Sequence, residues 1–371
     1  MVTLKDKFRG CIAASWIGSA MGAAVEGWSR EEIAEKHGYL DELVPYAHYN
    51  DRVKWDRPGG TTEDGIERQK LIATAIIEKR DRVLAEDVAA VWVRDLDAQK
   101  IIYKQEPFDR ALLELAGAGL PPSEIGKLWL YPNVVSLARA GHPIGLINAG
   151  DPRGAADDSF EVGKLYAPQT AFALRWTALY NAAIAEACTC GATVESVLET
   201  AKKFVQYRRE GESIYGPYDT IEREVERALA LAEKHTDAME MRDEFYEHYA
   251  GGGYFNYGAS QANEIVSKGL AVFAITQGDP REAILTSVNF GRDTDCLAAV
   301  AGGLSGALSG TATVPREWVD QVNRATREDA YTNNSRSIEE TADGLFAAFL
   351  ARRKRLAEYL NSMGEPDYLA E

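Results

Sequence analysis

Apolar residues recur every three or four positions along most of the chain, which is the spacing of α-helices that bury one face. Within Thr62–Arg80, for example, the apolar set is Ile66, Ala73, Ile76 and Ile77. Alternating patterns typical of strands are short, and only Tyr39–Pro45 and Ser213–Tyr215 qualify as weak candidates. The hydrophobic pattern therefore predicts an all-α fold.

Many of the periodic segments begin with Asp, Ser, Thr or Pro, which are residues that start helices. The predicted helices are Leu4–Val25, Thr62–Arg80, Asp87–Gln99, Pro107–Gly117, Pro122–Trp129, Tyr166–Cys188, Thr193–Arg208, Tyr218–His235, Met239–His248, Gly253–Thr276, Pro280–Val288, Pro315–Arg327 and Ser337–Leu360, with one more after Asp293-Thr294-Asp295. Breaker-rich segments predict loops at His48–Gly60, Gly141–Arg153, Glu210–Pro217 and Ala250–Gly258. No repeat of fixed period and no low-complexity linker divides the 371 residues, so we predict a single compact helical domain over 1–371.

Small residues stand at every fourth position in two of the predicted helices, in the first at Gly10, Ala14, Gly18 and Gly22, and in the second at Gly302, Gly306 and Gly310. A glycine inside a helix costs about 1 kcal/mol relative to alanine, so this spacing calls for a compensating gain. Close approach of another backbone provides one. We predict that both helices are central and tightly packed against neighbours. One candidate arrangement packs the two helices against each other.

The chain carries a net charge of −16. A nucleic-acid backbone and an anionic membrane surface would both repel it, so we expect neither as a partner. A nucleotide-like substrate stays open, because bound cations can reverse the field locally. The sequence contains no run of about 18 apolar residues, so we expect no membrane span.

Cysteine usage and the N-terminal segment favour a cytoplasmic protein. The cysteines are too few and too scattered for a disulfide framework, being Cys11, Cys188, Cys190 and Cys296. The small-residue stretch Cys11–Val25 is rich in Ala and Gly rather than Leu and contains Trp16, which disfavours a signal peptide. Nothing in the sequence indicates an oligomeric state.

Two acidic clusters, Thr62-Glu63-Asp64 and Asp293-Thr294-Asp295, each open an apolar helical segment. Carboxylates and a hydroxyl are the ligands that a hard divalent cation prefers. Each cluster alone can be explained as a helix cap. The second, however, precedes a nearly uncharged Gly/Ala-rich helix, and carboxylates at the start of a buried helix require a partner. We therefore predict a metal site where the two clusters meet.

Three segments together resemble the ADP-ribosylglycohydrolase family: Gly10–Trp28 with Gly18-Ser19-Ala20-Met21-Gly22 and Glu26, then Gly60–Gly65, and finally Gly291–Gly310. Their order and spacing match over nearly the whole chain. The resemblance implies an all-α orthogonal helical bundle that holds two Mg²⁺ ions, with Mn²⁺ as a possible substitute. It also implies cleavage of an N- or O-glycosidic bond at the anomeric carbon of ADP-ribose.

By position in the family's motifs, the resemblance implies that the metal ligands are Thr62, Glu63, Asp64, Asp293, Asp295 and Cys296. Glu63 stands where the family usually has Asp, and Cys296 stands where it has Thr or Ser. A thiol suits Mg²⁺ poorly, so one metal position is expected to be weaker, to take a water, or to prefer a softer ion. Ser19 replaces the Asp that is common in the first motif.

The resemblance also suggests residues that contact the substrate. Glu26 falls where the family has an acidic residue over the site, and either Glu26 or Asp295 would move the proton in a hydrolysis. The plain alternative for Glu26 is an ordinary glutamate at a helix end. The family's ribose-binding Gly-Asn-Gly loop has only a loose substitute, and the predicted substrate-binding set is Gly145, Asn148, Gly150 and Tyr254.

Three functions follow from these features. The leading prediction is a metal-dependent hydrolase of ADP-ribose conjugates, with an ADP-ribosylated side chain or small molecule as substrate. A hydrolase acting on a nucleoside or another small N-glycoside is the alternative from the same scaffold. A non-catalytic protein of this fold is the third reading.

Overall fold

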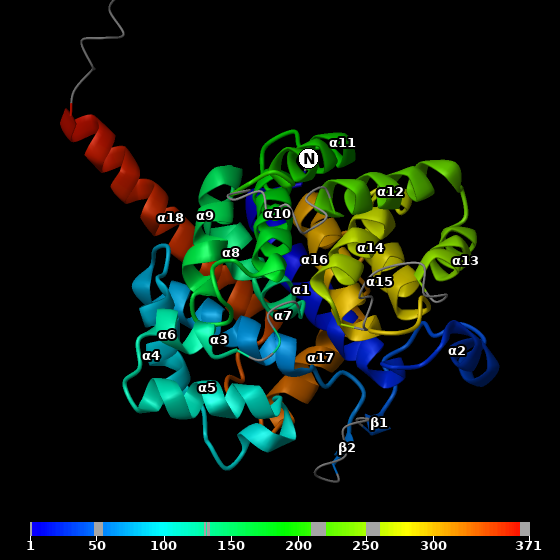
Figure 1. The fold of residues 1–371 in the computed structure, drawn as a ribbon, viewed down its shortest axis with the longest axis horizontal. Helices are drawn as coiled ribbons and strands as arrows, with labels where there is room; N and C mark the ends of the chain where they lie inside the picture. The colour runs from blue at the N-terminus through cyan, green and yellow to red at the C-terminus, as the bar shows by residue number, and fades with distance from the viewer. Residues whose placement is uncertain are drawn as a thin grey trace, which may run out of the picture.

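Two glycine-bearing helices, α1 (Leu4–Gly22) and α16 (Thr294–Ser309), pack against each other at the centre of the computed structural model (Figure 1). A Cβ atom at Gly10 would lie 2.5 Å from the carbonyl of Gly310, and one at Gly22 would lie 2.5 Å from the Thr294 carbonyl oxygen. The prediction of two central, tightly packed helices is confirmed, and their partners are each other. Since the pair is antiparallel, the end of α1 meets the start of α16.

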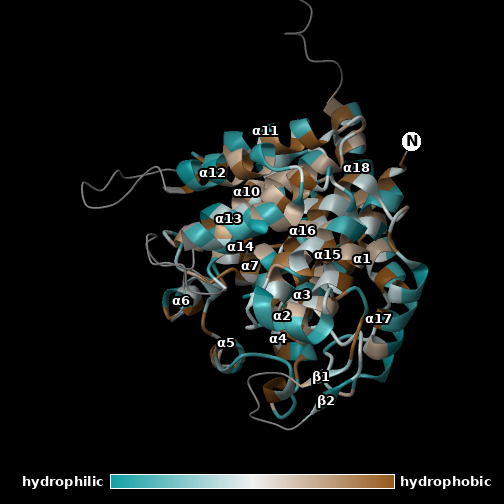
Figure 2. Cartoon of the chain, turned by 90° about the vertical axis from the view of Figure 1, so that its right-hand side faces the viewer, coloured by the Kyte–Doolittle hydropathy of each residue, from teal (hydrophilic) through white to brown (hydrophobic). Residues whose placement is uncertain are grey.

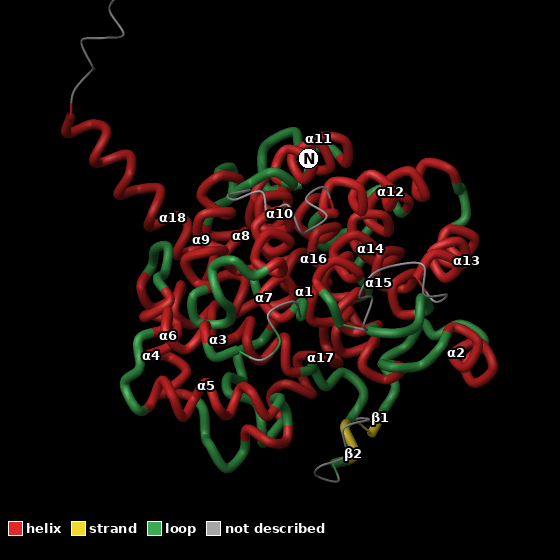
Figure 3. The backbone as a smooth tube through the Cα atoms, viewed as in Figure 1, coloured by secondary structure: helices red, strands yellow, loops and turns green. Residues whose placement is uncertain are grey.

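The structure describes residues 2–47, 55–129, 131, 134–208, 220–249 and 260–363. Helices form nearly all of the regular structure in these ranges, which confirms the all-α fold (Figure 3). The remaining α-helices are α2 (Arg30–His37), α3 (Asp64–Lys79), α4 (Ala85–Asp95), α5 (Pro107–Gly117), α6 (Pro122–Lys127), α7 (Ser136–Ala140), α8 (His142–Ile147), α9 (Pro152–Gly163), α10 (Phe172–Ala187), α11 (Val194–Phe204), α12 (Thr220–Lys234), α13 (Ala238–Tyr249), α14 (Ala262–Ile275), α15 (Pro280–Val288), α17 (Arg316–Glu328) and α18 (Ile338–Met363). Short 3₁₀ helices are η1 (Ala23–Val25) and η2 (Ile101–Tyr103), and a small antiparallel hairpin joins β1 (Tyr46–Ala47) and β2 (Asp56–Arg57).

One continuous cluster of buried side chains runs from Phe8 in α1 to Ala348 in α18. The ribbon around α16 is pale or hydrophobic, whereas the peripheral helices α12 and α13 carry many hydrophilic residues (Figure 2). The single domain over 1–371 stays a prediction that this cluster favours. Within the described ranges, every helix is too short or too polar to cross a lipid bilayer.

Proline accounts for the largest error in the predicted elements. Gly141–Arg153 was expected to be a loop, yet it contains α8 and the first residues of α9. Pro143 and Pro152 both stand in the first turn of a helix, where the missing N–H has no intrahelical partner to lose. The side chain of Asp151 caps α9 by accepting from the amide of Gly154 at 2.8 Å. These prolines start helices here and do not interrupt them.

The weak strand at Tyr39–Pro45 is also wrong, because the strand that forms is β1, directly after it. The other weak strand, Ser213–Tyr215, lies outside the described residues, as do the loops predicted at Glu210–Pro217 and Ala250–Gly258.

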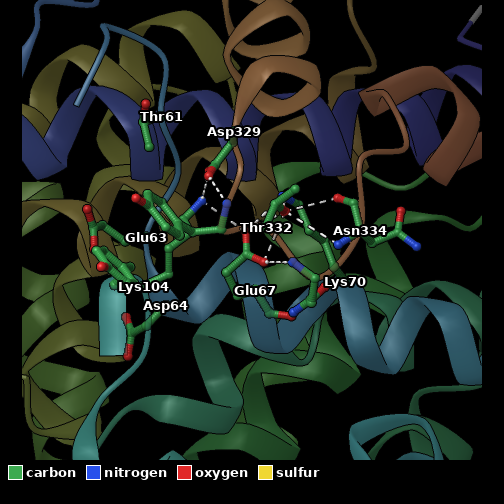
Figure 4. A network of polar contacts seen from close by, with 12 residues as sticks. Thr61, Glu63, Asp64, Glu67, Lys70, Lys104, Asp329, Thr332 and Asn334 are labelled. Carbon is green, nitrogen blue, oxygen red and sulfur yellow. Dashed lines mark hydrogen bonds and ion pairs between the residues drawn. The ribbon is translucent and has the colours of Figure 1, made fainter. Parts of the chain in front are cut away.

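A buried polar network fixes the position of α3 (Figure 4). Glu67, one turn after Asp64, accepts hydrogen bonds from Lys70 at 2.9 Å and from Lys104 at 3.1 Å. The hydroxyl of Thr332 lies 3.0 Å from both of its oxygens. Burial opposes the charge of Glu67, but Lys104 and Lys70 outweigh it and lower its pKa to about 2. The network therefore anchors the start of α3 to the segment between α17 and α18.

His142 joins four helices at the centre of the fold. Its Nδ1 lies 3.0 Å from Nε2 of Gln69, and its Nε2 lies 2.8 Å from the hydroxyl of Tyr180 and 3.1 Å from the Ala299 carbonyl oxygen. The ring is completely buried, and this burial lowers the pKa of His142 to about 4. A neutral imidazole therefore links α8 to α3, α10 and α16.

In a His142→Gln variant, we expect the stability lost relative to the wild type to shrink as the pH falls from about 7 to about 4. The unfolded chain takes up a proton below about pH 6.5 and the folded chain does not, so the contribution of the histidine is complete above pH 6.5 and is lost toward pH 4. The full change corresponds to about 3 kcal/mol in the free energy of unfolding. Urea denaturation across this pH range measures it, with His37→Gln as the control. A difference that does not vary with pH would contradict the buried neutral ring.

Candidate metal centre

The second acidic cluster forms the N-terminus of α16. Asp293 is the N-cap residue, and its Oδ1 accepts a hydrogen bond from the amide of Cys296 at 3.3 Å. Asp295 and Cys296 occupy the first turn. One ligand atom from each of these three residues lies within 4.8 Å of the others, and all three residues are buried. The group can hold a cation with two carboxylates and one sulfur atom.

The packing of α1 against α16 brings Glu26 to the same place. The hydroxyl of Thr294 donates to the carbonyl of Gly22 at 2.7 Å, which holds the end of α1 at the start of α16. Two backbone hydrogen bonds of 2.7 Å, from Gly27 to Arg292 and from Arg292 to Trp28, then pair the loop after η1 with the loop before α16. Glu26 is therefore positioned over the cluster by backbone contacts.

The first acidic cluster precedes and opens α3. Thr62 and Glu63 are buried, and Asp64 is the first residue of the helix. Figure 4 labels Glu63 and Asp64. From the β-hairpin, the hydroxyl of Tyr46 and the guanidinium of Arg57 both contact Oε1 of Glu63 through short hydrogen bonds. One oxygen of Glu63 is thus committed to the protein.

Arg139, from the short helix α7, connects the two clusters. Its guanidinium forms ion pairs with Asp64 and Asp295, and its Nη1 lies 2.7 Å from the sulfur of Cys296. The side chain is 5% exposed. Burial opposes the charge of Arg139, yet the neighbouring Asp295 and Cys296 raise its pKa. Residues from opposite ends of the sequence therefore do converge, as predicted, around one positive charge.

Three buried oxygen atoms in this centre are reached by no N–H or O–H donor in the described part of the chain: Oγ1 of Thr62, Oδ2 of Asp293 and Oδ1 of Asp295. The carboxyl groups of Asp293 and Asp295 also interact with each other, which raises the pKa of Asp295. A buried polar atom without a partner costs about 1–3 kcal/mol, and a charged oxygen costs more. Oxygen atoms of a hydroxyl and of carboxylates are suitable ligands for Mg²⁺ or Mn²⁺. These residues fit a divalent cation.

The electrostatics lead to the same conclusion. Burial and the negative charges of Asp295 and Asp293 raise the pKa of Glu26 well above its usual value. Burial also raises the pKa of Asp295, because Arg139 offsets only part of that cost and Asp293 adds to it. The arginine balances only part of the charge that these carboxyl groups would carry, so their neutral forms are favoured, and a bound cation would favour the ionised forms instead.

The centre forms one end of a cavity of about 630 Å³. Glu26, Asp64, Arg139 and Cys296 line this end. The wall beyond them comes mainly from α5, α6 and the segments that flank them. Apart from Glu106 and Ser260 its larger side chains are apolar or aromatic: Phe108, Leu112, Leu115, Ile125, Leu128, Trp129 and Tyr131. The cavity can hold a ligand with one polar end and one apolar or aromatic end.

The cavity also contains Arg68. This residue is ion-paired with Asp109 at 2.6 Å and with Asp64 at 2.7 Å. Both arginines of the described lining are therefore neutralised by carboxylates.

Comparison with known proteins identifies the family of this chain. The sequence profile of the ADP-ribosylglycohydrolase family matches residues 1–355. The chain belongs to this family. A protein of Archaeoglobus fulgidus named only as uncharacterized is 23% identical over 331 residues, covering 85% of this chain and 92% of that protein. A solved structure named as an ADP-ribosylglycohydrolase-related protein complex matches with a TM-score of 0.62 at 18% identity, over 95% of this chain and 99% of that chain. This likeness shows that the fold is shared.

Not every residue that the family resemblance suggested lies at this centre. Gly145, Asn148 and Gly150 are absent from the described lining of the cavity. Asn148 is buried, donates to Oδ2 of Asp158 at 2.7 Å and accepts from Arg352 at 3.0 Å. Its side-chain amide is therefore hydrogen-bonded within the protein. These positions sit in and after α8, because the expected loop is helical. Tyr254 lies outside the described residues.

Three residues of this centre were not predicted from the sequence: Arg139, Arg57 and Tyr46. Arg139 left a faint signal, because it is a lone charge in the otherwise apolar and small stretch 134–140. Arg57 and Tyr46 lie in segments with no periodic pattern, and only the hairpin directs them toward Glu63.

Proposed function

We propose that this chain is a divalent-cation-dependent hydrolase that cleaves the N- or O-glycosidic bond of ADP-ribose conjugates at the ribose anomeric carbon. Membership of the ADP-ribosylglycohydrolase family supports glycoside hydrolysis. The single observation that carries the cation dependence is the set of buried oxygens of Thr62, Asp293 and Asp295 that lack a partner in the described chain. Asp293 and Asp295 form one group with Cys296, and Cys296 lines the polar end of the cavity.

The proposed ligands are Thr62, Asp293, Asp295 and Cys296, with Asp64 and Glu63 beside them. Mg²⁺ is the proposed ion, and Mn²⁺ is the alternative that tolerates the sulfur of Cys296 better. When bound, the cation would orient the ribose hydroxyls and supply an activated water for hydrolysis.

Glu26 is the proposed proton carrier. Unlike the completely buried Asp295, it lines the cavity, where a substrate can reach its carboxyl group. Its raised pKa means that it holds a proton at a higher pH than an ordinary glutamate, which suits donation to the leaving oxygen or nitrogen. Asp295, held by Arg139, would stabilise the positive charge that develops on the sugar.

A second candidate is hydrolysis of a nucleoside or another small N-glycoside. The lining of the cavity favours it, because the described wall is mostly apolar, its further charged residue Glu106 is negative, and both of its arginines are already ion-paired. A pyrophosphate group requires positive charge or several free donors, and an aromatic leaving group requires neither.

We further propose that the protein works in the cytoplasm. The described cysteines are all free, and the acidic composition disfavours nucleic acid and anionic membranes as partners.

A substrate panel tests the proposal. Purified protein is incubated with ADP-ribosyl-arginine, ADP-ribosyl-serine and a set of nucleosides, in EDTA, Mg²⁺ or Mn²⁺, and the products are separated by chromatography. We expect release of ADP-ribose only with a divalent ion. Release of free base from nucleosides alone would establish the second candidate. Tight binding of ADP-ribose without turnover of any substrate would show a non-catalytic member of the family.

A further inference from the structure

We infer that the guanidinium of Arg139 takes the position of one of two cations, so that this centre binds a single divalent ion. The inference rests on the cation dependence of the proposed function. It assigns that ion to Thr62, Asp293, Asp295 and Cys296 and assigns the space between Asp64 and Asp295 to the arginine.

The carboxylates of the first cluster are already neutralised by arginines. Oδ1 of Asp64 is paired with Arg139, and Oδ2 is paired with Arg68 at 2.7 Å. Glu63 is paired with the buried Arg57. Little charge therefore remains on the first cluster to attract a divalent ion.

The carboxylates of the second cluster are not balanced in this way. Oδ2 of Asp293 and Oδ1 of Asp295 lack partners in the described chain, and so does the hydroxyl of Thr62. Arg139 contacts Asp295 and Cys296, but it is shared with Asp64. The unsatisfied carboxylate oxygens thus lie together with Cys296 at the start of α16, and this group suffices for one ion that completes its shell with water or substrate.

Arg139 is built into this position by the fold. A Cβ atom at Gly65 would lie 2.6 Å from Cδ of Arg139 and would overlap the guanidinium, so the absence of a side chain at Gly65 makes the space that the arginine fills. The carbonyl of Arg139 also accepts from Gln69 at 3.3 Å and lies 3.0 Å from Nδ1 of His142. A second divalent ion in the same space would meet both the side chain and its positive charge.

Manganese binding tests the inference. The wild-type chain is loaded with Mn²⁺, freed of excess ion by gel filtration, and analysed for metal content and by electron paramagnetic resonance. We expect one Mn²⁺ per chain with the spectrum of an isolated ion. In Arg139→Met we expect two Mn²⁺ per chain and the spectrum of a coupled pair, because Oδ1 of Asp64 and Oδ2 of Asp295 are then released from the arginine and can bind the second ion.

Gly65→Ala provides an independent variant that keeps the arginine. The added Cβ displaces the guanidinium from between the two aspartates, so the metal content should also rise toward two. Arg352→Met is the matched control, because Arg352 is a largely buried arginine that contacts Asn148 at 3.0 Å, away from the centre. It should keep one Mn²⁺.

Two Mn²⁺ ions in the wild type, or one in both Arg139→Met and Gly65→Ala, would overturn the role assigned to Arg139. No Mn²⁺ in the wild type would overturn the inference together with the cation dependence. The same samples are assayed with the substrate panel. One bound ion without hydrolysis would leave the inference standing and refute the proposed activity.

Discussion

Replacement of Asp293 by asparagine is expected to lower kcat/KM by about a thousand-fold while the protein remains folded. The side chain of Asp293 has two separate tasks. Oδ1 caps α16 by accepting from the amide of Cys296 at 3.3 Å, and an asparagine oxygen can do the same. Oδ2 lacks a partner in the described chain, and asparagine removes its charge. The variant therefore loses the proposed cation and keeps the helix.

Asp279→Asn is the matched control for this substitution. Asp279 also caps a helix, α15, by accepting from the amide of Glu282 at 3.0 Å, and it is absent from both the metal-binding group and the cavity lining. Its variant should keep full activity and metal content. Steady-state kinetics, metal analysis and circular dichroism on both variants measure their activity, metal content and folding. Wild-type turnover and wild-type metal content in Asp293→Asn would show that the cluster is only a helix cap.

Replacement of Gly10 by alanine is expected to destabilise the protein by about 2–3 kcal/mol. The new Cβ would lie 2.5 Å from backbone atoms of Gly306 and Gly310, far inside van der Waals contact. Backbone cannot move aside as a flexible side chain can, so α1 and α16 must separate. The gain in helix propensity, about 1 kcal/mol, offsets only part of this cost. Urea denaturation measures the change in the free energy of unfolding.

The same substitution at Gly117 should have the opposite sign. Gly117 is the last residue of α5, and a Cβ added there would meet no described atom within 4 Å. Alanine should therefore be neutral or stabilise the protein by up to about 1 kcal/mol. Equal effects of Gly10→Ala and Gly117→Ala on the free energy of unfolding would show that α1 and α16 are packed less closely than in the structure.

Local signals in the sequence were sufficient for much of the fold. The ends of α5 and α15 were predicted correctly because proline starts both helices. The glycine spacing in α1 and α16 predicted close packing, since the cost of each glycine calls for a compensating contact. The helices α2, α7, α8 and α9 were missed. The five or six residues of α7 and α8 carry too little periodicity to distinguish a helix from a loop, whereas α9 has twelve residues and its Pro152 was interpreted as part of a loop.

The sequence by itself determined the helical class, the presence of two tightly packed glycine-bearing helices and the two acidic clusters, because each depends on neighbouring residues or on a fixed spacing. That these two helices pack against each other came from the tertiary structure. Only the tertiary structure decided how the charges of those clusters are balanced. Arg139, Arg68 and Arg57 reach the first cluster from three different elements, whereas Asp293 and Asp295 keep unpartnered oxygens within the described chain. The i, i+4 spacing of Asp64 and Arg68 is local, but the contacts of Arg139 with Asp64 and Asp295 depend on distances between segments far apart in the chain, and no local pattern encodes them.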